Sequence, residues 1–375
     1  MIFDIRISFI VGLFIIICIA LMIFNFIITH HSRGQSTPSA DTVKKWISIL
    51  NKQVTTTPDN TSGTLKHEQF LLKRLSNIEE LIAYFHALQH RKSESLEAYN
   101  NYAHKQHEAF QKLADRYKKK SSTERACYAN FICDFPDLAG NPYGHMVDIL
   151  ISYIDNSTVH CRMSVLRVLC SIGSTHGIVN ALQVINDKHL FVHKQLLTDE
   201  LLNFKGDKEI LGAYLWSGAL HWNDNIADSV VQFITRFSDS YNEVFLPVLQ
   251  NSSIGAEVRI AIIRYYGKYV CEAAQPTLIG FITEPTNINL ACEAAFALAL
   301  YPTYDTITAL KSALYRPEWN LRYSASLALI KMKNTIDLLS ALENESNYAT
   351  ELVTYMLELE YMLSEKEMDG EIVIA

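Results

Sequence analysis

The sequence predicts an all-α protein: an α-solenoid of about seven helical hairpins, preceded by one more helical hairpin and one transmembrane helix. Three observations lead to this prediction. An uncharged apolar run lies near the N-terminus, apolar residues recur at helical spacing from residue 65 onward, and similar segments recur roughly every 32 residues after residue 120. Of the 375 residues, 49% are hydrophobic and 19% are charged, which excludes a disordered chain.

Residues 7–29 contain no charged side chain. A helix of that length measures roughly 34 Å, enough to span a hydrocarbon core of about 30 Å. A cleaved signal peptide is the alternative, but its apolar region would be shorter and a small-x-small site would follow it. The segment therefore predicts an uncleaved single-pass anchor.

Charge is distributed unevenly along the chain. Residues 43–125 carry a net charge of +6 and residues 126–375 a net charge of −13. Because positive residues favour the cytoplasmic side, we expect an inner-membrane protein with a cytoplasmic body and a basic juxtamembrane region that contacts anionic lipid. The acidic distal part argues against binding nucleic acid.

Between the anchor and the repeats, composition predicts two further segments. Residues 30–64 are rich in Ser, Thr, Pro, Gly and Asn and predict a linker with one short helix at residues 41–53. Residues 65–120 contain no Pro or Gly and show helical spacing of apolar residues, which predicts a helical hairpin. The repeats then occupy residues 121–364, and residues 365–375 form a flexible tail.

Each repeat is predicted to be a pair of antiparallel helices. The first helix carries an apolar i, i+4 stripe, and a second apolar helix begins about 19 residues after the start of the motif. Three recurring arginines, Arg162, Arg259 and Arg322, are expected to bridge to acids or helix ends of a neighbouring repeat. The seven motifs start at Arg125, Arg162, Lys194, Asp228, Arg259, Ala291 and Arg322.

The sequences of these motifs resemble HEAT-like repeats of the short bacterial type. The resemblance rests on Val258-Arg259, on Leu321-Arg322 and on Pro276 at the start of a second helix, and it covers about residues 122–364. The signatures of tetratricopeptide and ankyrin repeats are missing. Stacked pairs of this kind bury their apolar faces against each other and leave a concave surface, lined by the second helices, that binds macromolecules or peptides.

No sequence motif for catalysis, cofactor binding or metal binding is present, so no catalytic, cofactor or metal residue is predicted. The pairs His67-Glu68 and His107-Glu108 are too few for the iron sites of repeat-built enzymes and are expected to lie on solvated helix faces. Aromatic residues outside the repeat frame are better candidates for binding a protein partner, because Trp and Tyr are enriched at interface hot spots. Filling gaps between irregular repeats is the alternative role of these residues, which are Tyr214, Trp216, Trp222, Phe245 and Trp319.

The expected function is that of a non-catalytic, membrane-anchored scaffold or adaptor without a cofactor. Bacterial proteins that this chain resembles imply a partner in an envelope polysaccharide glycosyltransferase system. Two alternatives stay open: a repeat-built enzyme or enzyme subunit of the lyase or hydroxylase kind, and an outward-facing periplasmic assembly module.

Overall fold

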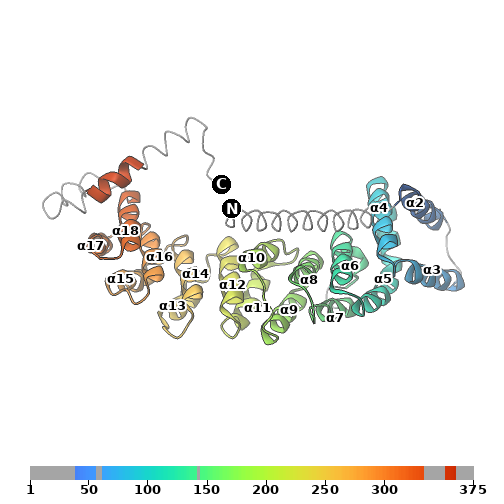
Figure 1. Ribbon diagram of the computed structural model, residues 1–375, viewed down its shortest axis with the longest axis horizontal. Helices are drawn as coiled ribbons and strands as arrows, with labels where there is room; N and C mark the ends of the chain where they lie inside the picture. The colour runs from blue at the N-terminus through green and yellow to red at the C-terminus, as the bar shows by residue number, and fades with distance from the viewer. Residues whose placement is uncertain (1–38, 56–60, 142–143, 333–350, 360–375) are drawn as a thin grey trace, which may run out of the picture. The chain divides into compact units, whose positions relative to one another are not determined.

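The computed structural model describes residues 39–55, 61–141, 144–332 and 351–359, and these ranges are all-helical, as predicted (Figure 1). They contain no β-strand. None of their helices combines the length and the apolar character that crossing a membrane requires. The predicted transmembrane segment at residues 7–29 and the predicted tail at residues 365–375 lie outside the described residues.

Contacts divide the chain into two compact units, Met1–Gly177 and Ile178–Ala375. The first unit contains α2 (Ala40–Thr55), α3 (Thr61–Arg74), α4 (Ile78–Glu94), α5 (Leu96–Lys118), α6 (Ser122–Asp134), α7 (His145–Ser152), α8 (Val159–Ile172) and the start of α9 (Thr175–Asp187). The second unit contains the rest of α9, then α10 (Lys194–Leu202), α11 (Lys208–Ala219), α12 (Asp224–Phe237), α13 (Asn242–Gln250), α14 (Ala256–Tyr266), α15 (Gln275–Thr283), α16 (Ile288–Leu298), α17 (Tyr304–Ala313), α18 (Trp319–Lys331) and a helix at residues 351–359.

Within the first unit the helices form successive pairs. The first helices α2, α4, α6 and α8 pack one against the next, and the second helices α3, α5 and α7 do the same. The predicted short helix in the linker is α2, and its Trp46 is buried against Tyr84 of α4 at a ring-centroid distance of 5.0 Å. The stacking therefore begins earlier in the chain than the repeat motif.

The predicted hairpin at residues 65–120 is divided differently, into α3, α4 and α5. The extra break lies before α4, where the Asn77 side chain accepts the backbone N–H of Glu79 and caps the new helix. A capping Asn can start a helix without Pro or Gly, so the absence of those two residues from 65–120 did not exclude a boundary here. As a result α4 packs on α5, while α2 packs on α4 and α3 packs on α5.

Buried tyrosines connect the second helices of the first unit to their neighbours. The hydroxyls of Tyr117, Tyr128 and Tyr153 donate to the backbone carbonyls of Leu75, Phe110 and Ala114 at 2.8, 2.6 and 2.7 Å respectively. All three side chains are fully buried, so each hydroxyl needs such a partner. Each of these tyrosines thus buries an apolar ring and also satisfies its hydroxyl group with a hydrogen bond.

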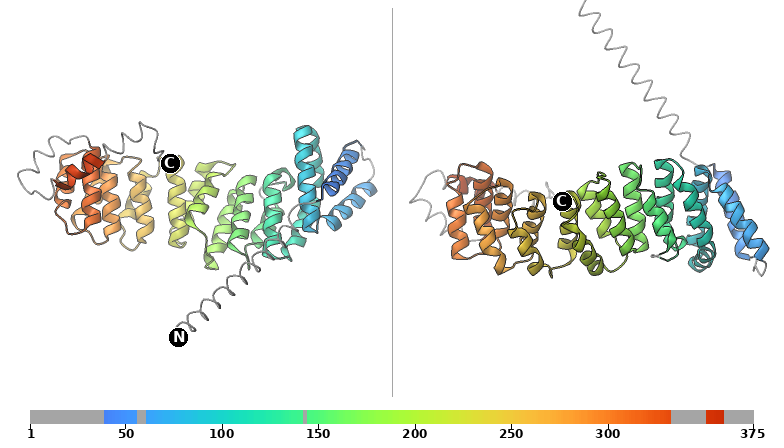
Figure 2. Two further views of the ribbon diagram at one scale, coloured as in Figure 1. Left: turned by 45° about the horizontal axis from the view of Figure 1, so that its top comes forward. Right: turned by 90° about the horizontal axis from the view of Figure 1, so that it is seen from below.

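In the second unit the first helices α10, α12, α14, α16 and α18 pack in sequence order and stand side by side in Figure 2. Close packing of α16 depends on small residues, since Ala291, Ala294 and Ala295 are fully buried on it.

Across both units, the seven predicted motifs fall on α6, α8, α10, α12, α14, α16 and α18. The predicted second helices are α9, α11, α13, α15 and α17, and the one predicted at residues 335–342 lies outside the described residues.

The recurring arginines hydrogen-bond to the ends of the preceding helices. Arg259 Nε donates to the carbonyl of Leu249 at 3.0 Å, in the last turn of α13. Arg322 donates to the carbonyls of Arg316 and Pro317 after α17, and Arg162 donates to that of Ser157 after α7. Arg259 thus supplies a donor to the end of α13, whereas Arg162 and Arg322 bond to carbonyls of the loops that follow α7 and α17.

Replacing Ala294 by Leu tests the packing of α16. The added atoms have no space between the neighbouring first helices, so we expect the stability of α14, α16 and α18 to fall by about 1–3 kcal/mol. Hydrogen-exchange protection of their amides measures this change. Asn289→Leu, at an exposed position of the same helix, is the control and should change protection little. Equal effects of the two variants would contradict the close packing.

Candidate functional site

Two of the five predicted binding residues lie in the core, which corrects the prediction for them. Phe245 is completely buried and Trp222 is 7% exposed. The Trp222 indole N–H donates to Gln183 Oε1 at 2.8 Å, and its ring covers Gly218 so closely that a Cβ there would lie 2.6 Å from the ring. Both side chains therefore hold neighbouring elements together, as the alternative interpretation expected.

The other three predicted residues do reach the surface. Trp216 is half-buried, with its ring edge against Phe245 at 4.8 Å. Tyr214 is 60% exposed on the same helix, α11, whereas Trp319 is 49% exposed at the start of α18, where the Arg322 guanidinium lies 5.5 Å from its ring. The structure thus brings together Trp216 and Phe245 but places Trp319 on a different element.

Exposed yet uncharged second helices are the main surface feature of the second unit. After the first turn, α11 and α13 contain no charged residue, and α15 contains none at all. Their exposed positions include Ile210 (51%), Tyr214 and Val244 (43%), together with Ala213, Ser217, Pro247 and Gly280. A solvent-facing helix normally places charged residues on its outer face. We call the exposed side chains of α11, α13 and α15 the second-helix surface.

The first helices of this unit are charged. Lys194 Nζ on α10 lies 2.9 Å from Asp228 Oδ2 on α12 and 2.9 Å from Glu257 Oε2 on α14. Asp228 is buried and also accepts a hydrogen bond from Gln232 at 2.7 Å. Hydrogen bonding to Glu257 and Asp228 raises the pKa of Lys194, so this ammonium stays charged. The first helices α10, α12 and α14 therefore differ in charge from α11, α13 and α15.

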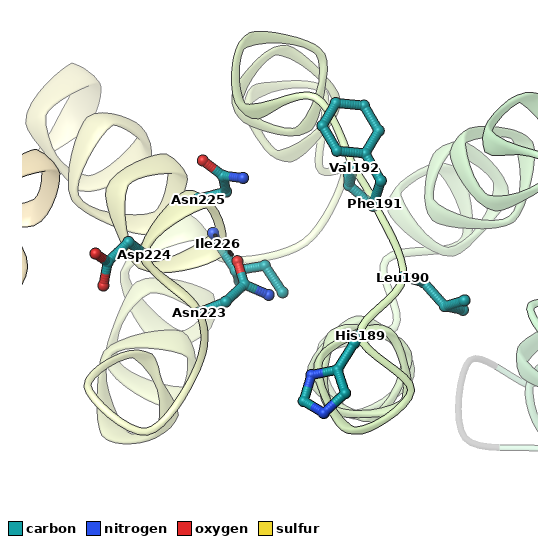
Figure 3. Close-up of a pocket in the computed structure, with 8 residues that line it drawn as sticks. All are labelled: His189, Leu190, Phe191, Val192, Asn223, Asp224, Asn225 and Ile226. Atoms are coloured by element: carbon teal, nitrogen blue, oxygen red, sulfur yellow. Dashed lines mark hydrogen bonds between the residues drawn. The ribbon is translucent and has the colours of Figure 1, made fainter.

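A cavity of about 390 Å³ lies between the loop after α9 and the start of α12 (Figure 3). Its walls are residues 189–192 and residues 223–226, which face each other in the figure. The polar groups of Asn223 are used within the fold, since its N–H donates to Asn186 Oδ1 at 2.8 Å and its Oδ1 accepts from the Ile226 N–H at 3.1 Å. The exposed Phe191 ring adds apolar surface. The cavity can receive a side chain or small molecule but contains no arranged acid–base pair.

A second, smaller groove of about 250 Å³ lies between α4 and α6 in the first unit. Half of its eight lining residues are Leu81, Ile82, Phe85 and Phe131, and the other half are His86, Cys127, Asn130 and Asp134. Asp134 lies at the groove too, and burial raises the pKa of its carboxyl group although Lys92 and Arg167 act in the opposite direction. We call this feature the α4–α6 groove. It depends on helix spacing and had no signal in the sequence.

The two His-Glu pairs do not converge. Glu68 forms an ion pair with Lys112 at 2.6 Å, and His107 Nδ1 lies 2.9 Å from the carbonyl of His104. His67 is half-buried, and that burial lowers its pKa to about 4. Within the described ranges, no three His, Cys, Asp or Glu side chains meet in a group that could hold a metal ion.

No protein-family model matches the chain, and no curated protein is significantly similar to it.

Trp222→Phe tests the structural role of this side chain. The variant keeps the ring in the core but loses the hydrogen bond to Gln183, so we expect a loss of stability of about 0.5–1.5 kcal/mol. Thermal unfolding measures it. Partner binding should not change, and a variant of normal stability that loses partner binding would contradict this role.

The pKa of His67 predicts a pH dependence of stability. The unfolded chain takes up a proton near pH 6.5, whereas folded His67 does so only near pH 4. The folded state should therefore lose stability as the pH falls from 6.5 towards 4, and His67→Gln should lose less over this window. Unfolding midpoints at pH 7.5 and pH 4.5 measure the difference, and parallel pH profiles would contradict it.

Proposed function

We propose that this protein is a non-catalytic scaffold or adaptor that binds a protein partner on the second-helix surface. The observation that supports this proposal is that the exposed faces of α11, α13 and α15 carry almost no charged side chains. The cores of protein–protein interfaces are depleted in charged residues, and this surface shares that depletion.

The central contacts of the proposed interface lie on α11. Ile210 and Tyr214 are four residues apart and thus share one face of the helix, and both are more than half exposed. The helix is firmly supported, because Trp216 packs on Phe245 of α13 and Leu211 and Leu215 are fully buried. A rigid support lowers the entropy cost of binding.

The finer features of the proposal come from the sequence. Residues 7–29 would anchor the chain in the inner membrane with a cytoplasmic body, and the basic helices near the anchor would contact anionic lipid. Anchoring confines a partner to a thin layer and raises its effective concentration. The arginine at the start of several first helices and the short period support a HEAT-like assignment, and that resemblance makes an envelope polysaccharide glycosyltransferase the proposed kind of partner.

Site-specific photocrosslinking in cells tests the proposed surface. A photoreactive amino acid at Ile210, Tyr214 or Val244 should produce one discrete crosslinked species. Leu196, on the first helix α10, is the matched control because it is 49% exposed and apolar but lies outside the second-helix surface. A crosslink of equal yield at Leu196 would contradict the proposal.

A substitution tests the energetics of the same surface. Tyr214→Lys should weaken binding of the crosslinked partner about tenfold or more, since burying an unpaired ammonium in an apolar interface is costly. The matched change at the control position, Leu196→Lys, should leave affinity within about twofold. Titration of the purified partner against the full chain measures both.

A further inference from the structure

The first helices α16 and α18 present apolar side chains to solvent at one end of the second unit. Residues four apart share one face of a helix, and this spacing selects exposed and half-buried apolar residues on both helices. Trp319, at the start of α18, is 49% exposed, and Leu300, just after α16, is 46% exposed. We call this feature the α16–α18 face, and its side chains are Cys292, Phe296, Leu300, Trp319, Tyr323 and Leu327.

The outer faces of the two helices adjoin. Helix α16 packs against α18, and a hydrogen bond joins Cys292 of α16 to Ser324 of α18. The ring of Trp319 lies 6.5 Å, centroid to centroid, from that of Tyr323 one turn further along the helix. Apolar surface therefore continues from one helix to the next, and a segment of chain that lies across it can contact both.

This end of the second unit is positively charged. Residues 304–331, which comprise α17, α18 and the turn between them, carry four cations and two acids, a net charge of +2. Lys331 is exposed one turn after Leu327 and forms no ion pair in the described part of the chain. The acid nearest the centre of the face, Glu293, is already paired with Arg264 of α14. The uncharged polar side chains at the margin of the face are Asn289 and Asn320.

The chain itself contains a segment of complementary chemistry. Residues 372–374 are Ile, Val and Ile, and residues 360–371 before them carry a net charge of −4. The last described helix, at residues 351–359, lies at the α18 end of the second unit in Figure 1 and Figure 2. Twelve residues of chain can reach roughly 40 Å, about four times the spacing of packed helices. Residues 372–374 can therefore reach the α16–α18 face.

We infer that residues 372–374 dock on the α16–α18 face of the same chain, with the acidic residues before them next to Lys331. Docking removes the apolar surfaces of both partners from water. Because Trp319 and Lys331 lie at opposite ends of α18, the charges fix the direction in which the segment runs.

The docked segment covers Trp319, which the sequence predicts to bind a partner, so the chain holds its own competitor for this residue. It also gives a place to part of residues 365–375, for which the sequence predicts a flexible tail. The inference does not rest on the proposed function, because the second-helix surface lies on α11, α13 and α15 and the α16–α18 face on two first helices.

Alkylation of Cys292 in the full chain, held in a lipid nanodisc, tests the inference, and mass spectrometry follows each thiol separately. Ile372→Asp places a carboxylate in the apolar contact and should release the segment. We therefore expect Cys292 to react about three- to tenfold faster in this variant than in the wild type. Cys271 is equally half-buried but lies between α14 and α15, outside the face, and should react at an unchanged rate.

The matched control is Ser364→Asp, which adds the same charge to the same stretch of chain, leaves residues 372–374 intact and should not change the Cys292 rate. A synthetic peptide of residues 365–375, added to Ile372→Asp, should slow the reaction of Cys292 again. Equal Cys292 rates in the wild type and Ile372→Asp, or an equal rise at Cys271, would overturn the inference.

Charge reversal tests the position of the acidic residues. Lys331→Glu should speed the alkylation of Cys292, because it places a carboxylate next to the acids of the segment. Reversing Glu367 and Glu371 to Lys in the same chain should restore the slow rate. A fast rate that persists in the triple variant would contradict the contact with Lys331.

Dilution distinguishes a contact within one chain from a contact between two copies. A segment that docks on its own chain protects Cys292 equally at every protein concentration, since its effective concentration is set by the connecting residues. Protection that is lost on dilution would assign the docked segment to a second copy and overturn the assignment to the same chain.

Discussion

Within each unit, the described helix pairs cover their apolar faces by packing on a neighbouring pair. Within each unit, first helix packs on first helix, and the contact is made by an i, i+4 stripe of apolar or small residues. Where the stripe is alanine-rich, as on α16, the helices approach closely. Where the approach is wider, as between α4 and α6, a groove results. The variation in this one contact explains both the regular parts of the fold and its most distinctive site.

Stacking short helices creates many helix ends, and the unpaired carbonyls at those ends must find donors. Long polar side chains supply them. Arg162, Arg259 and Arg322 bond to carbonyls at or after the end of the preceding helix, and Tyr117, Tyr128 and Tyr153 bond to carbonyls of neighbouring repeats. Charged side chains of the first helices thus help to hold the fold together. In the second unit, α11, α13 and α15 carry almost no charged side chains, and their outer faces are exposed.

The sequence predicted the helices of the repeats well because the same stripe recurs seven times, and repetition strengthens a weak local signal. It missed the break before α4, which depends on one capping side chain, Asn77. Exposure of the aromatic residues was harder to predict. Tyr214 and Trp222 look equivalent in the sequence, but only the structure shows that Trp222 bonds to Gln183 on a neighbouring helix. The α4–α6 groove could not be predicted, since it depends on the distance between two helices. The low charge of α11, α13 and α15 could have been found by counting charged residues helix by helix.

The position of Lys194 also sets how the second unit deforms. Its ammonium contacts Asp228 and Glu257 at once and so joins α10, α12 and α14. Bending that separates these helices on this side must break both ion pairs and uncover a buried carboxylate, whereas bending in the opposite sense brings the charges no further apart. Lys194 therefore opposes a separation of α10, α12 and α14 on this side of the unit. Because Lys194 and Glu257 are partly solvent-accessible, salt weakens this effect.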